Sequence, residues 1–317
     1  MKLPLCFICL VLILFLSGCG GSGVTNSSNE KITGNFSGCA VGAFVGGLDN
    51  LEAFQSMIGQ NLAVVHWYVH WQDPFPTAEA NLVAASGSVP LITWEPWVSH
   101  TLGTLEAIAS GSFEAYVSNF LLAAKNWGRP ILLRFAHEMN GNWYPWDGSH
   151  NGAAAGPAKY QQAWRYIYNV RERVKASNVS LVWIPNNNNL PDAAWNEPAN
   201  YYPGDQYVDW VGLDGYNWGY SAWEDFSAVF NSAYNQLITL TNKPLMIAEF
   251  ASAEQGGSKA VWLSETLALV QTDYTRIKLL CYFNVNKERD WRLNSSPSAE
   301  AAFRSGISSS YFVQKML

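Results

Sequence analysis

From residue 38 onward, short apolar runs alternate with longer amphipathic segments. The short runs are typical of strands buried on both faces, and the longer segments are typical of helices that cover a sheet. We expect strands at residues 39–44, 62–67, 89–93, 131–135, 180–184, 210–214, 245–248 and 278–283. We expect helices near 49–59, 77–86, 113–127, 158–177, 223–241, 258–272 and 298–305, with a mostly irregular segment over 186–208.

This alternation predicts one α/β domain over residues 37–317, a single (β/α)₈ TIM barrel. Strands separated by helices form a parallel sheet, and right-handed crossovers close eight of them into a barrel of roughly 250 residues. A doubly wound open sheet is the alternative, but it usually carries a Gly-rich phosphate turn after its first strand. The glycines of residues 42–47 have the wrong spacing, and no acidic partner follows the second strand.

The N-terminus reads as a targeting segment. Lys2 precedes an apolar run over residues 3–16 that is too short for a secure membrane span. Residues 16–19, Leu-Ser-Gly-Cys, match the bacterial lipoprotein signal, so residues 1–18 are a signal peptide and Cys19 becomes the lipidated N-terminus. An ordinary secretory signal and an uncleaved anchor are alternatives, and all three export the domain.

Residues 19–36 are rich in Gly, Ser and Asn and are typical of a flexible tether. We therefore expect an exported protein, lipid-anchored on the periplasmic or surface side of a bacterial membrane, which it contacts only through this anchor. Cys39 and Cys281 lie on the first and last strands, which are neighbours in a closed barrel. A disulfide between paired parallel strands has awkward geometry, so we expect two buried thiols.

Composition limits the partners. The net charge of −6 becomes −7 without Lys2, and no basic stripe is present, which excludes nucleic acid as an expected partner. Charged residues make up 14% of the chain, which also contains 15 tryptophans. Flat aromatic surface with few charges suits a neutral, ring-shaped ligand. We expect a monomer.

Chemistry concentrates where the predicted strands end. Strand 131–135 begins as an apolar run and then delivers Arg134, His137 and Glu138, followed by the polar, aromatic loop to Trp146. Other strand ends carry similar groups. In chain order these are residues 66–71, 94–97, 186–189 and 214–218, then Glu249, Asn284 and Trp291. Barrel enzymes place catalysis on this C-terminal face.

Glu138 after strand four and Glu249 after strand seven are the candidate catalytic pair. The two strands lie across the barrel mouth from each other, so their carboxylates face one cleft. Glycosidic bond cleavage needs such a pair, one to protonate the leaving oxygen and one to attack or stabilise the sugar carbon. Single side chains on opposed strands predict the shorter separation of roughly 5–5.5 Å, and therefore retention of configuration.

Neighbouring residues have expected roles too. Arg134 would keep Glu249 ionised, Tyr216 would donate to Glu249, and His137 would orient Glu138 or line a subsite. Each could instead be a satisfied polar group at the barrel rim. We also expect five residues to bind substrate: Trp94, Trp143, Trp218, Asn284 and Trp291.

His-Glu-Met-Asn-Gly-Asn-Trp at 137–143 and Ile-Ala-Glu-Phe at 247–250 resemble glycoside hydrolase family 26, which contains many β-mannanases. The segments 94–97 and 209–216 extend the resemblance. It implies a (β/α)₈ barrel and retaining double displacement with Glu138 as acid/base, Glu249 as nucleophile and no metal or cofactor. It also implies that His137 replaces the Asn of related glycosidases, and that Trp143 and Tyr216 lie near the −1 sugar.

Strand eight departs from the mannanase pattern. Typical family mannanases carry a Trp-Arg-Asn-style motif there, whereas this chain has residues 281–287, Cys-Tyr-Phe-Asn-Val-Asn-Lys, with Asp-Trp-Arg at 290–292. This pattern resembles family members that act on β-glucans or exopolysaccharide as much as mannanases, with Trp291 as the sugar platform. We expect an endo-acting β-1,4-glycanase, first a mannan endo-1,4-β-mannosidase and alternatively a β-glucanase or exopolysaccharide hydrolase.

Three other classes of protein fit the sequence less well. A zinc protease would need a second His after His137-Glu138, but residue 141 is Gly. A serine hydrolase would need a Gly-x-Ser-x-Gly elbow after a strand, which this sequence lacks. A non-catalytic polysaccharide-binding lipoprotein would need to have lost Glu138 or Glu249, and both are present.

Overall fold

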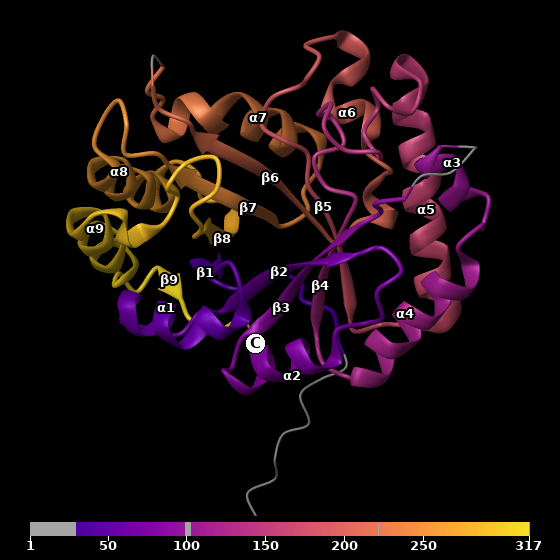
Figure 1. Cartoon of the computed structure of the whole chain (residues 1–317), viewed down its shortest axis with the longest axis horizontal. Coiled ribbons are helices and arrows are strands. Elements are labelled where there is room, and N and C mark those ends of the chain that lie inside the picture. The colour runs from indigo at the N-terminus through magenta and orange to yellow at the C-terminus, as the bar shows by residue number, and fades with distance from the viewer. Residues whose placement is uncertain (1–29, 99–102, 221, 317) are drawn as a thin grey trace, which may run out of the picture.

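The computed structural model describes residues 30–98, 103–220 and 222–316. Strands β1 to β8 are parallel and close into a barrel, because β1 pairs with both β8 and β2. Helices surround these strands (Figure 1), so the predicted (β/α)₈ barrel is confirmed. A short ninth strand, β9, pairs with the start of β1. Among the described residues, no helix combines the length and the apolarity needed to cross a membrane.

The strands are Cys39–Phe44 (β1), Val64–His70 (β2), Val89–Glu95 (β3), Ile131–Phe135 (β4), Val179–Trp183 (β5), Trp210–Asn217 (β6), Leu245–Ser252 (β7), Ile277–Phe283 (β8) and Phe312–Val313 (β9). The α-helices are Leu51–Ile58 (α1), Thr77–Ala85 (α2), Thr104–Ala109 (α3), Glu114–Trp127 (α4), Gly156–Val174 (α5), Pro198–Tyr201 (α6), Phe226–Leu240 (α7), Lys259–Thr272 (α8) and Pro297–Ile307 (α9). The short helices α3 and α6 were not predicted.

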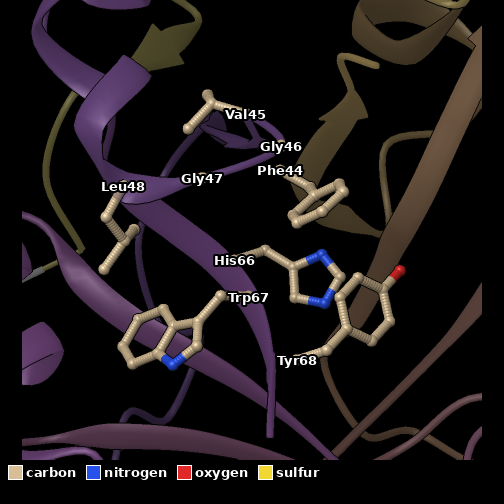
Figure 2. Close-up of a pocket in the computed structure, with 8 residues that line it drawn as sticks. All are labelled: Phe44, Val45, Gly46, Gly47, Leu48, His66, Trp67 and Tyr68. Carbon is tan, nitrogen blue, oxygen red and sulfur yellow. The ribbon is translucent and has the colours of Figure 1, made fainter. Parts of the chain in front are cut away.

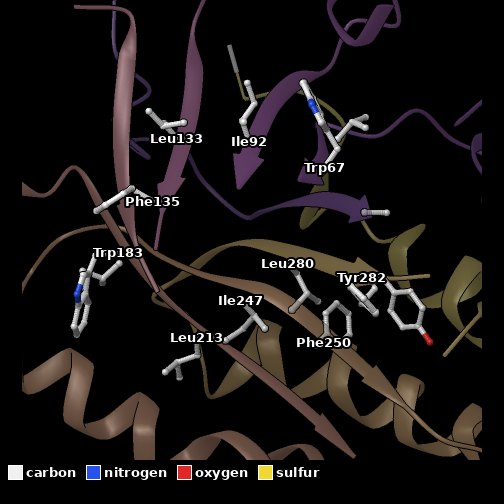
Figure 3. Packing of buried hydrophobic residues seen from close by; sticks show 14 of the residues in the cluster. Trp67, Ile92, Leu133, Phe135, Trp183, Leu213, Ile247, Phe250, Leu280 and Tyr282 are labelled. Atoms are coloured by element: carbon white, nitrogen blue, oxygen red, sulfur yellow. The ribbon is translucent and has the colours of Figure 1, made fainter. Parts of the chain in front are cut away.

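The core has two layers, separated by the alternation of side chains along each strand. Inside the barrel, small and aliphatic residues such as Leu132, Met246 and Leu279 pack together. Outside it, larger side chains pack between the strands and the helices. Figure 3 shows part of this outer layer, in which Phe250 and Tyr282 lie edge to face with ring centroids 5.1 Å apart. The same alternation decides which side chains reach the barrel mouth.

Strands β6 and β7 continue past their predicted ends. The predicted strands ended at Asp214 and at Ala248, but the ladder goes on to the pair Asn217 and Ser252. Ala248 is an extra residue in β7, because Ile247 and Glu249 face consecutive residues of β6, and the register against β8 shifts in the same place. This β-bulge changes the direction of the side chains that follow it.

The N-terminal end of the barrel is covered by the segment before β1. Ile32 is buried, its N–H donates to Ser180 Oγ at 3.1 Å, and its carbonyl accepts from Trp210 Nε1 at 2.7 Å. Lys31 pairs with Asp209 at 3.1 Å. The folded domain therefore begins ahead of residue 37, within the segment predicted as a tether. The predicted signal peptide and Cys19 lie outside the described residues.

Cys39 and Cys281 are free and buried, as predicted. Although β1 and β8 are paired, Cys281 lies opposite Gly42, three residues along β1 from Cys39. Burial raises the pKa of both thiols, so neither is set up as a reactive thiolate.

Candidate active site

Glu249 owes its position to the bulge in β7. Before the bulge, Met246 and Ala248 face the barrel interior while Ile247 packs outward. Strict alternation would turn Glu249 outward, but Phe250 takes the outward position and Glu249 accepts hydrogen bonds inside the barrel mouth. The extra residue thus brings the carboxylate into the cleft.

Three donors hold the Glu249 carboxylate. Tyr68 Oη donates to Oε1 at 2.5 Å, Arg134 Nη2 forms an ion pair with the same oxygen, and Tyr216 Oη donates to Oε2. Burial, followed by the charge of Glu249, raises the pKa of both tyrosines, so both remain phenol donors. Three donors fix the orientation of this carboxylate, as attack on a sugar carbon requires.

Arg134 lies beneath this carboxylate with no exposed surface. Its Nη1 donates to Asp214 Oδ2 at 2.7 Å and its Nε to Thr93 Oγ1 at 2.6 Å, while Nη2 reaches Glu249. One buried guanidinium therefore serves two buried carboxylates, and these contacts offset much of the cost of removing all three charges from water. The predicted contact between Arg134 and Glu249 is present.

Glu138 follows β4 in a left-handed backbone conformation, with φ of 51°. Such a conformation is uncommon for a residue other than glycine and is often found at functional sites. Asn186 Nδ2 donates to its Oε1 at 2.8 Å and Trp143 Nε1 donates to its Oε2 at 2.9 Å. Burial, and then the charge of Glu249, raise the pKa of Glu138 to about 7, whereas the two hydrogen bonds lower it. A carboxyl group with this pKa can act as an acid near neutral pH.

The two glutamates line one cleft of about 1020 Å³ at the C-terminal end of the barrel. Trp97, Trp143 and Tyr144, from the loops after β3 and β4, form one aromatic wall. Trp218 and Trp291, from the loops after β6 and β8, contribute to another part of the lining. The exposed rings of Trp97, Trp143 and Trp218 offer stacking surfaces for sugar rings.

Tyr216, Trp218 and Trp291 form a connected group in this lining. The Trp291 ring lies 5.0 Å from that of Tyr216 and 5.1 Å from that of Trp218, centroid to centroid. Trp291 is almost fully buried, while Trp218 is 45% exposed. The structure therefore places Trp143, Tyr216, Trp218 and Trp291 in the cleft, where the sequence predicted them.

Trp94 and Asn284 were predicted to bind substrate, and the structure places both elsewhere. Trp94 points outward from β3, stacks on Phe120 of α4 at 4.3 Å and has no exposed surface, because alternation turns Thr93 and Glu95 inward instead. Asn284 is engaged in the loop after β8, where its Oδ1 accepts from the N–H of Leu293 at 2.8 Å. Neither lines the cleft.

His137 has a different place from either predicted role. It is buried, its Nε2 lies 3.2 Å from Tyr144 Oη, and its carbonyl accepts from Trp146 Nε1 at 2.7 Å. It therefore supports the cleft-lining Tyr144 rather than touching Glu138. Burial and the charge of Arg134 lower the pKa of His137, so the imidazole is neutral.

Tyr68 and Asn186 are site residues to which sequence reasoning gave no role, although both lay in the strand-end segments it singled out. Figure 2 shows Tyr68 beside His66 and Phe44, with Trp67 on the other side of β2. The Tyr68 ring lies 4.6 Å from that of His66 and 5.0 Å from that of Phe44. Alternation along β2 is the signal that identifies Tyr68, since Val64 already faces the interior.

Three side chains could together hold a metal ion: those of His137, Asp214 and Glu249, whose donor atoms lie within 4.8 Å of one another. Arg134 already supplies a positive charge to both carboxylates of this group. A metal cation placed among these groups would be repelled by the guanidinium of Arg134.

A closed parallel barrel whose mouth pairs an acid-type glutamate with an ion-paired one defines a barrel glycoside hydrolase. The model of glycosyl hydrolase family 26 matches residues 102–304, and the chain belongs to this family.

The relatives of this chain include an endoglucanase, mannan endo-1,4-beta-mannosidases and beta-1,3-xylanases. Endoglucanase H of Acetivibrio thermocellus is 39% identical over 285 residues, covering 86% of this chain and 31% of the relative. A mannan endo-1,4-beta-mannosidase of Bacillus subtilis strain 168 is 29% identical over 157 residues, covering 49% of this chain and 40% of the relative. The chain thus spans less than half of the length of either relative.

Solved structures share the fold. The YdhT protein from Bacillus subtilis superposes with a TM-score of 0.66 at 19% identity, covering 90% of this chain and 89% of that structure. A Cellulomonas fimi endo-beta-1,4-mannanase double mutant gives 0.66 at 19% identity, with 89% and 73% covered.

Proposed function

We propose that this protein is an endo-acting, retaining glycosidase that cleaves a β-1,4-linked polysaccharide. One observation carries the proposal: two glutamates line the same cleft in opposite electrostatic settings. Glu249 accepts from Arg134, Tyr68 and Tyr216, whereas the pKa of Glu138 is raised to about 7. Such a difference supports Glu249 as the nucleophile and Glu138 as the acid.

In the first step, Glu249 attacks the anomeric carbon and the glycosidic C–O bond breaks. Glu138 gives its proton to the departing oxygen, so the leaving chain departs as an alcohol while the other sugar stays bound to Glu249 as an ester. Trp143 and Asn186 keep the Glu138 carboxyl oriented through this transfer. The donors to Glu249 stabilise its charge before the attack and must release it as the ester forms.

In the second step, Glu138 acts as a base. The charge of Glu249 is among the causes that raise the pKa of Glu138. Ester formation removes that charge, so the pKa of Glu138 falls and the carboxylate can take a proton from water. The water attacks the anomeric carbon from the face that the leaving group left, the ester bond to Glu249 breaks and restores its carboxylate, and the anomeric configuration is retained.

Mannan is the first proposed substrate. The family resemblance and the curated relatives named mannan endo-1,4-beta-mannosidase, at 27–33% identity, support it. The cleft has a volume of about 1020 Å³ and several aromatic side chains in its lining, which suits binding of more than one sugar of a polymer, as endo action requires.

A β-glucan is the second candidate, and a specific observation favours it. Endoglucanase H matches 86% of this chain at 39% identity, whereas those mannosidases match 41–63% of it. The loop after β8, which departs from the mannanase pattern in sequence, contributes Trp291 to the cleft. The higher coverage and identity of the endoglucanase, together with this loop, support a substrate with a glucan main chain.

The discriminating experiment is product analysis on β-1,4-mannan, glucomannan, mixed-linkage β-glucan and cellulose oligomers. Oligosaccharides of intermediate length from mannan support the first substrate, and the same products from a glucan alone support the second. NMR of the first-formed anomer tests retention, and an inverted product would overturn the assigned roles. Binding of every glycan without cleavage would instead support a non-catalytic binding protein.

We also propose that the domain is exported, anchored through a lipid on Cys19 and monomeric. Support comes from the signal-like residues 1–18 and the Leu-Ser-Gly-Cys motif. Cys19→Ala should move the protein from the membrane fraction to the soluble fraction of its host. Light scattering of the domain from residue 30 onward tests the monomer.

A further inference from the structure

Lys259 is a buried cation that the proposed reaction does not use. It begins α8, and it has no exposed surface. Its Nζ donates to the carbonyl of Asp290 at 2.8 Å, to the carbonyl of Arg292 at 2.9 Å and to Ser295 Oγ at 2.7 Å. Burying an ammonium group costs free energy, so three good acceptors are needed to keep it there.

The two carbonyls that Lys259 binds lie on either side of Trp291. A single ammonium therefore holds the backbone on both sides of this residue. The carbonyl of Trp291 itself accepts from Tyr282 Oη at 2.6 Å, and its ring packs against Tyr216 and Trp218 in the cleft. The position of the ring follows from the position of this backbone.

Glu254 holds the same segment from the loop between β7 and α8. Its Oε1 accepts from Ser295 Oγ at 2.7 Å and from Ser296 Oγ at 2.8 Å. Ser295 thus connects Glu254 with Lys259. Lys259 and Glu254 together bind four residues within 290–296. These contacts clamp the segment against α8 and the loop before it.

We infer that Lys259 is a positioning residue. By clamping the backbone on both sides of Trp291, it sets the sugar-binding wall of the cleft that Tyr216, Trp218 and Trp291 form. The inference rests on the proposed function, because the wall matters only if the cleft binds a glycan. Lys259 acts through Trp291 and does not line the cleft itself.

The protonation state of Lys259 depends on the pH. Burial, and to a lesser extent the charge of Arg292, lower its pKa to about 8, whereas Glu254 and Asp290 oppose the shift. Above this pH the neutral amine has two N–H groups for three acceptors. The clamp should therefore weaken as the pH rises through about 8.

The kinetic test compares Lys259→Met, Lys259→Arg and Trp291→Ala on the polymer that the wild type cleaves best. We expect Lys259→Met to raise KM about 10-fold with little change in kcat, since it displaces a binding surface rather than a reacting group. Adding Lys259→Met to Trp291→Ala should change KM little further. Lys259→Arg should retain most of the affinity, and Lys315→Met, at an exposed lysine, is the control.

Two results would overturn the inference. One is an unchanged KM in a folded Lys259→Met protein, and the other is a full additional loss of affinity in the double variant. In the wild type, KM should rise above pH 8, and the rise should be absent in Lys259→Arg. A rise of equal size in both proteins would also contradict the clamp.

A measurement without substrate separates this inference from the proposed function. Chymotrypsin should cut Lys259→Met near Trp291 at least about 10-fold faster than the wild type, as the local opening becomes more populated. Equal cutting rates in two folded proteins would contradict the clamp. If no glycan is hydrolysed but the variant is cut faster, the proposed function fails and the clamp stands.

Discussion

Arg134 of β4 and Glu249 of β7 form an ion pair beneath the cleft, and the guanidinium also binds Asp214 of β6. The arginine has no exposed surface, so solvent screens these charges little. The pair therefore sets a buried positive charge against the Glu249 carboxylate and fixes its orientation. This contact distinguishes the environment of Glu249 from that of Glu138, and the roles proposed for the two glutamates rest on that difference.

Replacing Glu249 with Gln or Ala should abolish turnover. The covalent step needs its carboxylate, so we expect kcat to fall by at least about 10⁴-fold on polymer and on aryl glycosides alike. Steady-state hydrolysis measures the loss, and circular dichroism checks the fold. A Glu249 variant that kept substantial activity would show that another group attacks the sugar.

Replacing Glu138 with Ala should separate substrates by their leaving groups. Polymer hydrolysis should fall by roughly 10²–10⁴-fold, because a sugar alkoxide needs the proton that Glu138 provides. A dinitrophenyl glycoside leaves without that proton, so its bond cleavage should be much less affected. Burst kinetics on the aryl glycoside report this step. Equal losses on both substrates would contradict the role of Glu138.

The pH dependence should follow the proton on Glu138. Activity requires the protonated acid, so kcat/KM should decline as the pH rises through about 7, the raised pKa of this group. Trp143→Phe removes a hydrogen bond that lowers this pKa, so the decline should move to higher pH. Trp127→Phe, whose indole donates to Asn81 at the surface, should leave the profile in place. A shift to lower pH in Trp143→Phe would contradict this account.

Tyr68→Phe should slow the reaction without unfolding the protein. It removes only the hydroxyl that donates to Glu249 at 2.5 Å, and the ring can keep its contacts with Phe44 and His66. We expect a loss of about 10–10²-fold in kcat/KM, in the range of a hydrogen bond to a charged group. Tyr202→Phe, which loses a hydroxyl bound to Asp205, is the matched control and should stay near wild-type activity.

Ile32→Ala should destabilise the barrel although it lies in the segment first predicted as a tether. The side chain is 3% exposed and packs at the N-terminal end of the barrel. Removing it should cost about 2–4 kcal/mol of unfolding free energy, as for other large-to-small core changes. Urea denaturation measures this, with the exposed Glu30→Ala as control. A loss below about 0.5 kcal/mol would show that the segment is dispensable.

Much of the architecture could be predicted from local pattern. The eight apolar runs identified the eight barrel strands, because each strand is buried on both faces and its pattern is written in consecutive residues. The motifs around Glu138 and Glu249 identified two of the carboxylates that line the cleft, which Glu95, Glu224 and Glu288 also line. Alternation along β2 would also have identified Tyr68, whose neighbour His66 already stood out.

Other features depended on contacts between distant parts of the chain. Trp94 and Trp97 stand three residues apart in one motif, yet Trp94 packs on α4 and Trp97 lines the cleft. Residue type alone does not separate the two as sugar platforms. Alternation along β3 turns Trp94 outward, but only the folded chain shows that α4 covers it. Likewise, only the fold shows that Lys259 binds the carbonyls beside Trp291.

The sequence by itself determined the barrel, the identity of the two glutamates and the departure of the loop after β8 from the mannanase pattern. The tertiary structure decided which way these groups face. Glu249 enters the cleft because β7 has one more residue than its two neighbours across Ala248. A bulge is a mismatch between paired strands, and pairing between residues far apart in the chain exists only after the barrel has closed.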